Sequence, residues 1–473
     1  KAILPTITTD DLHGVTDKWY TAKGRNIILI APEKDKDILP ATDDLLVLLN
    51  KPSQNQLSAY NEGDISQRLL LEVSPTPSSI IYKKYHKQFD ATEWRLANGV
   101  RVILKPTDFK KNSITFSAQS PGGTSLAGDE FFVSANHAID VVTYSGLGSF
   151  NTIELRKKLS GKNLSIKPSI YSLTEGMSGS STKEDLPTLF ELIYLYFTSP
   201  RFDEEDFENF KNNERELLIN KQLEPEEVFS DFFTSKLYNN HYRSRPWTVE
   251  LLEEINYQQA FQFYQDRFAN AGDFTFYFGG SFDLEKIQPL IETYLGGLPS
   301  THRKEHWKDR DVDYFSGNQS DILRMGLEPK STTYLVYTGP FSYTIRNRLN
   351  FNAMEKMLDI RLKETIREQI GGVYSIGAYG WKNKYPNPSY VFILFFNSDP
   401  ERQGEIITAI EREIANLQET GFGKSYLDKV NKQMLQEYKE KYKTNDFWLD
   451  VFQFYDWVGE PYTNIYRVEQ LHQ

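Results

Sequence analysis

The apolar positions between residues 92 and 300 follow two periods, one typical of strands and one typical of helices. Strand-like runs come first, and the Asn98-Gly99 pair between two of them marks a tight turn. Longer segments with apolar positions at helical spacing follow and predict amphipathic helices. The expected strands are 93–104, 114–119 and 274–278, and the expected helices are 128–143, 185–197, 203–223 and 257–268.

A second series of the same kind begins near Gly326. Its predicted elements follow the order strand, helix, strand, strand, helix, helix, and we read the same order in the segment between residues 92 and 300. We therefore expect an α+β protein with two related domains, each a mostly antiparallel sheet with helices packed on one face. The expected strands here are 333–338, 374–380 and 390–397, and the expected helices are 347–369, 402–419 and 424–442.

A weak internal repeat lies at the start of the chain. Residues 9–20 are predicted to form a helix, and the apolar run Ile27 to Ile30 is predicted to form a short buried strand. The same pair recurs without a gap 248 positions later, as helix 257–268 and strand 274–278. The match in pattern indicates an internal duplication.

Polar stretches divide the chain into domains. Residues 33–90 are polar and Pro-rich, and residues 301–325 are polar and charged, so both are predicted to be linkers. This leaves a first domain at 91–300 and a second at 326–473.

Composition excludes several classes of function. The net charge of −11 argues against a nucleic-acid-binding surface, which is usually basic. The 473 residues include no Cys, so disulfides, Cys zinc sites and a Cys nucleophile are excluded. The longest apolar run, near Leu189 to Phe197, is about half the length of a membrane span, so no membrane insertion is expected.

Two segments carry a resemblance to a known family. RLKETIREQIGGVY (361–374) contains the pattern Arg-Glu-x-x-Gly-x-x-Tyr, and FDLEKIQPLIETYLGGLP (282–299) is a second match. The chain resembles the C-terminal, non-catalytic half of a pitrilysin/insulinase-type zinc peptidase (inverzincin) of the long bacterial form. The resemblance implies two halves that close around a peptide-degrading chamber, with residues 1–32 as the terminal helix and strand of the preceding half. It also implies an N-terminal catalytic half in the same polypeptide, peptide substrates, and an extracytoplasmic location.

The zinc-binding motif of that family is degenerate here. Its His-x-x-Glu-His sequence aligns with residues 137–141, where His137 remains, Asp140 replaces the Glu and Val141 replaces the second His. The family's third ligand, a Glu, would fall near Leu218, with Glu216 two residues away. A catalytic zinc needs about three protein ligands, so we expect no metal in this chain and zinc in the full-length protein. His137 is expected to be a helix-packing residue.

Arg367 and Tyr374 match the family residues that contact the substrate carbonyl and hold the oxyanion at the zinc site of the other half. The resemblance therefore implies a catalytic and substrate-binding role for both. Gly371-Gly372 between them is expected to end the helix as a left-handed cap. The structural alternative is that Arg367 pairs with Glu364 or helix-end carbonyls and that Tyr374 packs in the sheet.

Residues 302–306 read His-Arg-Lys-Glu-His, a literal match to His-x-x-Glu-His in the wrong context. The charged surroundings lack an apolar helical stripe, so an exposed linker is the favoured interpretation. Two alternatives to the main hypothesis remain. The chain could be an inactive structural or peptide-binding scaffold, or an autonomous zinc peptidase that uses His302, Glu305 and His306.

Overall fold

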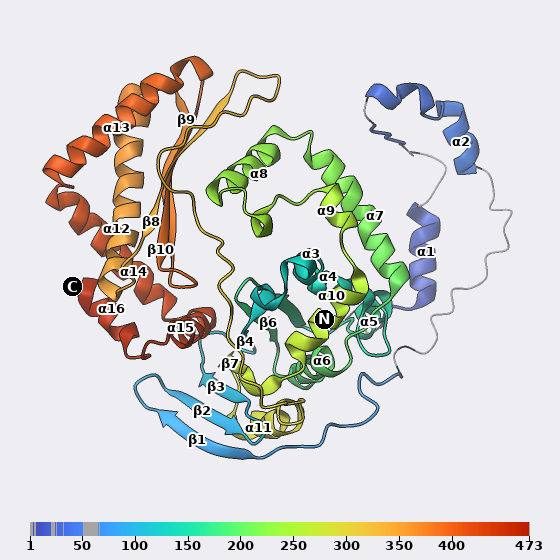
Figure 1. Cartoon of the computed structure of the whole chain (residues 1–473). Coiled ribbons are helices and arrows are strands. Elements are labelled where there is room, and N and C mark those ends of the chain that lie inside the picture. The colour runs from blue at the N-terminus through green and yellow to red at the C-terminus, as the bar shows by residue number, and fades with distance from the viewer. Residues whose placement is uncertain are drawn as a thin grey trace. The chain divides into compact units, whose positions relative to one another are not determined.

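The computed structural model describes residues 3, 6–19, 24, 26–31, 33–50, 65 and 67–472. They fall into two units, Lys1–Gly63 and Asp64–Gln473 (Figure 1). The first unit contains helices α1 (Thr9–Trp19) and α2 (Thr42–Asn50), and α1 confirms the helix predicted there. The strand predicted at Ile27 to Ile30 is wrong, because residues 26–31 form no strand and Ile30 is 91% exposed. An isolated run of this kind lacks the neighbouring strand that its backbone requires.

A seven-stranded sheet forms the centre of the first domain. Its strand order is β1-β2-β3-β7-β4-β6-β5, and among these pairs β3 and β7 run parallel while the others run antiparallel. This confirms the predicted α+β class. The strands are β1 (Ile80–His86), β2 (Ala91–Leu96), β3 (Arg101–Pro106), β4 (Ile114–Pro121), β5 (Leu164–Ile170), β6 (Thr174–Ser181) and β7 (Thr275–Gly280).

Two features of this sheet differ from the sequence-based expectation. Strand β1 lies inside the stretch 33–90 that was predicted to be a linker, and it pairs with β2. Residues 178–181 (SGSS) are small and polar, a composition typical of a turn, yet they lie in β6. Glycine is required at position 179, because a Cβ atom there would lie 2.0 Å from the Ser165 carbonyl oxygen of β5.

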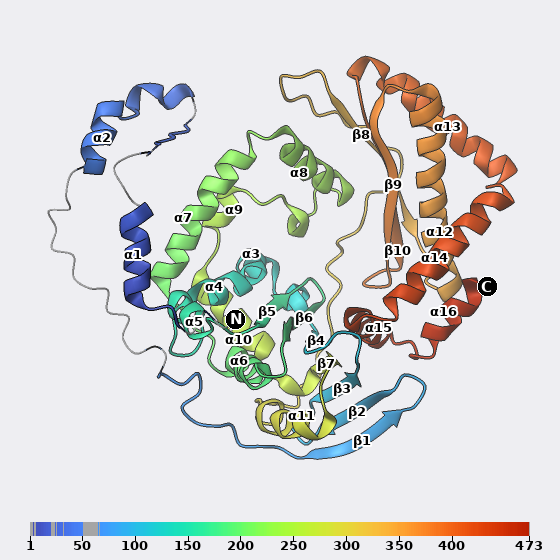
Figure 2. The same cartoon turned by 180° about the vertical axis from the view of Figure 1, so that it is seen from behind.

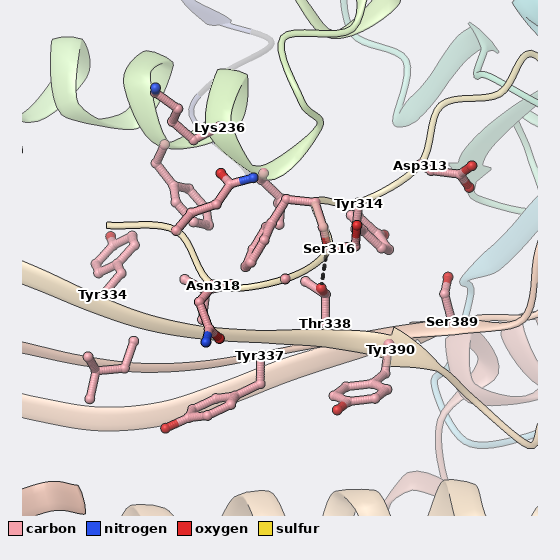
Figure 3. A pocket seen from close by; sticks show the side chains of 18 of the residues that line it. Lys236, Asp313, Tyr314, Ser316, Asn318, Tyr334, Tyr337, Thr338, Ser389 and Tyr390 are labelled. Carbon is pink, nitrogen blue, oxygen red and sulfur yellow. Dashed lines mark hydrogen bonds between the residues drawn. The ribbon is translucent and has the colours of Figure 1, made fainter. Parts of the chain in front are cut away.

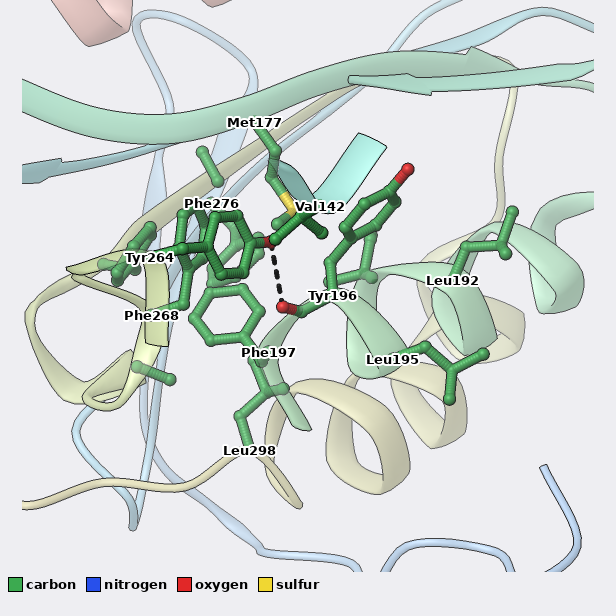
Figure 4. Close-up of a cluster of buried hydrophobic side chains, with 14 of the residues drawn as sticks. Val142, Met177, Leu192, Leu195, Tyr196, Phe197, Tyr264, Phe268, Phe276 and Leu298 are labelled. Atoms are coloured by element: carbon green, nitrogen blue, oxygen red, sulfur yellow. Dashed lines mark hydrogen bonds between the residues drawn. The ribbon is translucent and has the colours of Figure 1, made fainter. Parts of the chain in front are cut away.

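The main apolar core lies between this sheet and the helices on one of its faces. Figure 4 shows part of it, where Phe268 of α10 (Tyr257–Phe268) stacks on Tyr264 of the same helix and packs edge-on against Phe197 of α6 (Leu186–Thr198). The Tyr264 hydroxyl, which is fully buried, donates a hydrogen bond of 3.0 Å to the Tyr196 carbonyl. The helices of this domain are α3 (Phe132–Asn136), α4 (Ala138–Ser145), α5 (Thr152–Lys158), α6 (Leu186–Thr198), α7 (Glu204–Lys221), α8 (Pro225–Leu237), α9 (Val249–Glu253), α10 (Tyr257–Phe268) and α11 (Leu284–Leu290).

The second domain repeats the start of this plan on a smaller sheet. Its strand order is β8-β10-β9, and both pairs are antiparallel. Thr344 is the N-cap of α12 (Ile345–Leu362), and its hydroxyl accepts a hydrogen bond from the Asn347 amide. The elements are β8 (Ser331–Pro340), α12 (Ile345–Leu362), β9 (Val373–Asn383), β10 (Ser389–Ser398), α13 (Gln403–Thr420), α14 (Lys424–Lys441), α15 (Asn445–Val458) and α16 (Asn464–His472).

Helix α15, which the sequence analysis did not predict, packs on the other face of the first-domain sheet (Figures 1 and 2). Phe452 and Trp448 of α15 form one buried cluster with Tyr277 of β7. Asp456 accepts hydrogen bonds from Arg101 (2.6 Å) and from the Tyr277 hydroxyl (2.7 Å). The two domains therefore share an apolar cluster and an ion pair.

Candidate functional site

Arg367 lies in a π-helical segment, Lys363–Ile370, that continues α12 directly. Such segments are rare and frequently occur at functional sites. The side chain of Arg367 is 53% exposed, and its nearest carboxylate is that of Glu368 at 4.0 Å. Glu364, the partner considered in the sequence analysis, instead accepts a hydrogen bond from the Tyr426 hydroxyl.

The segment ends at two glycines. Gly371 has φ +69° and Gly372 has φ +78°, a backbone that other residues rarely adopt. The ψ of Gly371 is −177°, so the predicted left-handed cap is wrong in detail: the positive φ is present, but the chain leaves in an extended direction. The Gly371 amide donates to the Ile366 carbonyl (3.0 Å), which closes the last π turn.

Tyr374 is placed by a bulge in the pairing of β9 with β10. Asn397 pairs with Ser375 and the next residue, Ser398, pairs with Val373, so Tyr374 is the extra residue between them. Bulges of this kind redirect a side chain and recur next to active sites. Tyr374 is 69% exposed, which contradicts the alternative that it packs in the sheet.

A second arginine, Arg361, lies in the same sequence segment (361–374), just before the motif, and has a structural role. Arg361 Nε donates to Glu413 of α13 at 2.6 Å, and its Nη1 donates to the Tyr426 hydroxyl of α14 at 3.3 Å. These hydrogen bonds raise the pKa of Arg361 and tie α12 to both neighbouring helices. Of the two arginines, Arg367 is thus the one whose charge faces solvent.

The side chains of the degenerate zinc motif make packing contacts within the first domain. His137 stacks on Trp247 with ring centroids 4.0 Å apart, and its Nδ1 lies 2.8 Å from Asp140 Oδ2. His137 also interrupts the helix predicted at 128–143, because it lies between α3 and α4 with ψ +14°. Val141 is completely buried in the apolar core.

The position expected for the family's third zinc ligand is also occupied by a buried apolar residue. Leu218 on α7 belongs to the same buried cluster as Val141, and Glu216 is exposed to solvent. The residues around His137 therefore do not fit a catalytic zinc. Within the described ranges, no group of three or more His, Asp or Glu side chains could hold a metal ion.

The second His-x-x-Glu-His sequence has a different structure from a zinc-binding helix. Residues 301–310 form no helix, so His302 and His306 do not share a helical face. Glu305 accepts from Arg267 Nη1 (3.1 Å) and lies 2.9 Å from Arg303 Nη2. These contacts fix residues 301–310 against the first domain.

The groove in Figure 3 has a volume of about 1130 Å³ and lies apart from the Arg-Tyr motif. It runs along β8, an edge strand, and α8 and residues 312–319 border it. Lys236 pairs with Asp321 at its rim (2.7 Å), and the Thr338 hydroxyl donates to the Phe315 carbonyl. Arg367 and Tyr374 do not line this groove.

Residues 254–434, which include Arg367 and Tyr374, match the family model described as the peptidase M16 inactive domain. The match places residues 254–434 in the inactive domain of the M16 peptidases, the pitrilysin-type class. None of the helices in the described part of the chain combines the length and apolar content needed to cross a bilayer.

The relatives are PqqL-type zinc proteases. A probable zinc protease PqqL of Haemophilus influenzae is 22% identical over 431 residues, which cover 91% of this chain and 46% of that protein. A PQQL-like zinc protease of Arabidopsis thaliana is 21% identical over 467 residues, covering 95% of this chain and 46% of that protein. The crystal structure of the periplasmic protease PqqL from Escherichia coli matches with a TM-score of 0.75 at 17% identity, over 99% of this chain and 52% of that chain.

The chain is homologous to these PqqL zinc proteases and corresponds to the C-terminal half of an M16 peptidase. It spans about half the length of the relatives that it matches.

Proposed function

We propose that this chain supplies the oxyanion-stabilising half of a zinc-dependent peptidase that degrades peptides in a closed chamber. The observation that carries the proposal is the exposure of Arg367 and Tyr374 at the two ends of one glycine turn. A π-helical segment and a bulge, both of which recur at functional sites, present these two side chains.

The chemistry follows from the two side chains. The Tyr374 hydroxyl donates a hydrogen bond to the carbonyl oxygen of the scissile peptide bond and keeps its proton throughout. Negative charge develops on that oxygen as water adds to the carbonyl carbon, and the Arg367 guanidinium attracts this charge. Both interactions are stronger in the transition state than in the bound substrate, so they accelerate the reaction.

The N-terminal half of the same polypeptide would hold the zinc, which activates the attacking water. In this arrangement residues 1–32 belong to the preceding half. The periplasmic location of the Escherichia coli relative supports an extracytoplasmic compartment for the full-length protein.

The test is Tyr374→Phe in the full-length, zinc-loaded protein, assayed with an internally quenched fluorogenic peptide. This variant removes a single hydroxyl, and we expect kcat to fall by about 10²–10³ with KM changed little. The control is Tyr171→Phe, since Tyr171 is equally exposed, at 67% against 69%, and lies in the first domain. Unchanged kcat in Tyr374→Phe would favour the alternative of an inactive structural or peptide-binding scaffold.

The isolated chain gives a second, independent test. Because Val141 and Leu218 offer no lone pairs, we expect no stoichiometric zinc after dialysis and no chelator-sensitive cleavage of the same peptide. Cleavage that is lost in a His302→Ala/His306→Ala double variant would instead support the autonomous-peptidase alternative.

A further inference from the structure

Arg402 holds the turn formed by Gly371 and Gly372, and we call this contact the clamp. It connects the Arg-Tyr pair to the end of β10. Arg402, in the short helix Pro400–Arg402 just after β10, donates from Nη1 to the Gly371 carbonyl at 3.2 Å. The guanidinium also fills the space beside the next residue, since a Cβ atom at Gly372 would lie 1.6 Å from Nη1. Glycine at this position therefore meets two requirements: a positive φ and room for Arg402.

The clamp is itself held in place. Arg402 Nε and Nη2 donate to the two oxygens of Glu405 at 3.1 and 3.0 Å, in the bidentate geometry that orients a guanidinium. The Arg402 amide donates to the Asp399 carbonyl (3.1 Å), and the Asp399 carboxylate accepts from the Glu401 amide (2.8 Å). The turn that carries Arg402 is thus fixed by its own hydrogen bonds.

The clamp acts on the segment that separates the two exposed side chains. Arg367 precedes the glycines by four positions and Tyr374 follows them by two. The bulge at Tyr374 pairs with Asn397 and Ser398, directly before the turn of Arg402. Two consecutive glycines have wide conformational freedom, so a contact that holds their carbonyl restricts the relative orientation of Arg367 and Tyr374.

We infer that Arg402 is a positioning residue, which fixes the Gly371-Gly372 turn so that Arg367 and Tyr374 act on one substrate carbonyl. This inference rests on the proposed function of that pair. Arg402 does not touch the substrate and acts through the turn. A displacement of about 1 Å in such a group is enough to cost about 10²-fold in rate.

The experiment uses the full-length, zinc-loaded protein and the quenched peptide. Arg402→Met removes the hydrogen bonds, and we expect kcat to fall by about 10- to 100-fold with KM changed by less than about threefold. Arg402→Lys keeps the charge and a nitrogen that can donate to the Gly371 carbonyl, so it should restore a substantial part of kcat. Arg412→Met, at an exposed position of α13, is the matched control and should retain wild-type kcat.

A double variant separates positioning from a general structural role. In a Tyr374→Phe background the positioned hydroxyl is already gone, so Arg402→Met should lower kcat by much less than in the wild type. An equal loss in both backgrounds would overturn the inference. The proposed function fails separately if Tyr374→Phe keeps wild-type kcat, whereas the clamp alone fails if Tyr374→Phe loses activity and Arg402→Met matches Arg412→Met.

A measurement on this chain needs no activity. Hydrogen exchange at the amides of Gly372, Val373 and Tyr374 should become faster in Arg402→Met than in Arg412→Met, while exchange in the core strands stays unchanged. Gly372→Ala should give the same local change, because its Cβ atom would displace the guanidinium. Unchanged exchange at these amides in both variants would refute the clamp.

Discussion

Glu93 provides a quantitative test of the ion-pair network beneath α15. Its side chain is only 7% exposed, and Arg95 and Arg101 both donate to the carboxylate, with His86 Nε2 at 3.3 Å. Burial opposes ionisation of this group, but the hydrogen bonds and charge of Arg101, with help from Arg95 and His86, lower the pKa of Glu93 from 4.5 to about 2. At 1.36 kcal/mol per pH unit, this difference corresponds to about 3 kcal/mol of folding free energy.

The sign follows from the lower pKa in the folded state. The stabilisation is complete above the unfolded pKa of about 4.5 and is lost as the pH falls towards about 2. Glu93→Gln keeps the shape but not the charge, so it should lower the free energy of unfolding by up to about 3 kcal/mol at neutral pH and by less than about half of that near pH 3.

The assay is urea unfolding of both proteins at a series of pH values, with Glu72→Gln, an exposed site, as control. The reasoning is refuted if the stability curves of wild type and Glu93→Gln stay parallel between about pH 7 and about pH 3.

Two further predictions concern buried positions of the first domain. Burial raises the pKa of Glu175 to about 8, although the Gly123 amide (2.6 Å) and Arg267 favour its charge. The free energy of unfolding should therefore fall as the pH rises from about 5 to about 8. In urea unfolding, Glu175→Gln should lose less of this free energy than the wild type over the same pH range. Val141→His restores a second His near His137, yet the variant should bind no stoichiometric zinc, which metal analysis after dialysis checks. It should also lower the free energy of unfolding by roughly 2–3 kcal/mol, because it places a polar ring in a packed core. Urea unfolding measures this loss.

The α+β class and most of the long elements could be predicted from the hydrophobic pattern. Helices such as α7, α10 and α13 begin and end within one or two residues of the expected positions, since their apolar stripes and end residues are local signals. The helix predicted at 128–143 is broken at His137, where stacking on Trp247 is a long-range contact that no local pattern reveals.

For the candidate site, the sequence proposes residues but not their geometry. Family resemblance selected Arg367 and Tyr374 as candidates, whereas the bulge at Tyr374 depends on the register with β10, and the pattern of apolar positions does not distinguish a π turn from an α-helical one. Arg402 was missed because it is 28 positions from Tyr374, and its role follows only from the contact with Gly371. In the sequence, only the adjacent glycines Gly371 and Gly372 pointed to this contact, because paired glycines indicate that another group approaches the backbone closely.

The placement of α15 has a consequence for where this protein can be divided. Its aromatic side chains complete a hydrophobic layer that begins on β7, and Leu449 occupies the space that the missing side chain of Gly279 leaves open. A fragment ending near residue 300 would expose that layer to water, and one starting near residue 326 would expose the helix that covers it. Cutting the chain at the domain border predicted from the sequence would therefore expose apolar surface on both fragments, and residues 67–472 lie within one compact unit.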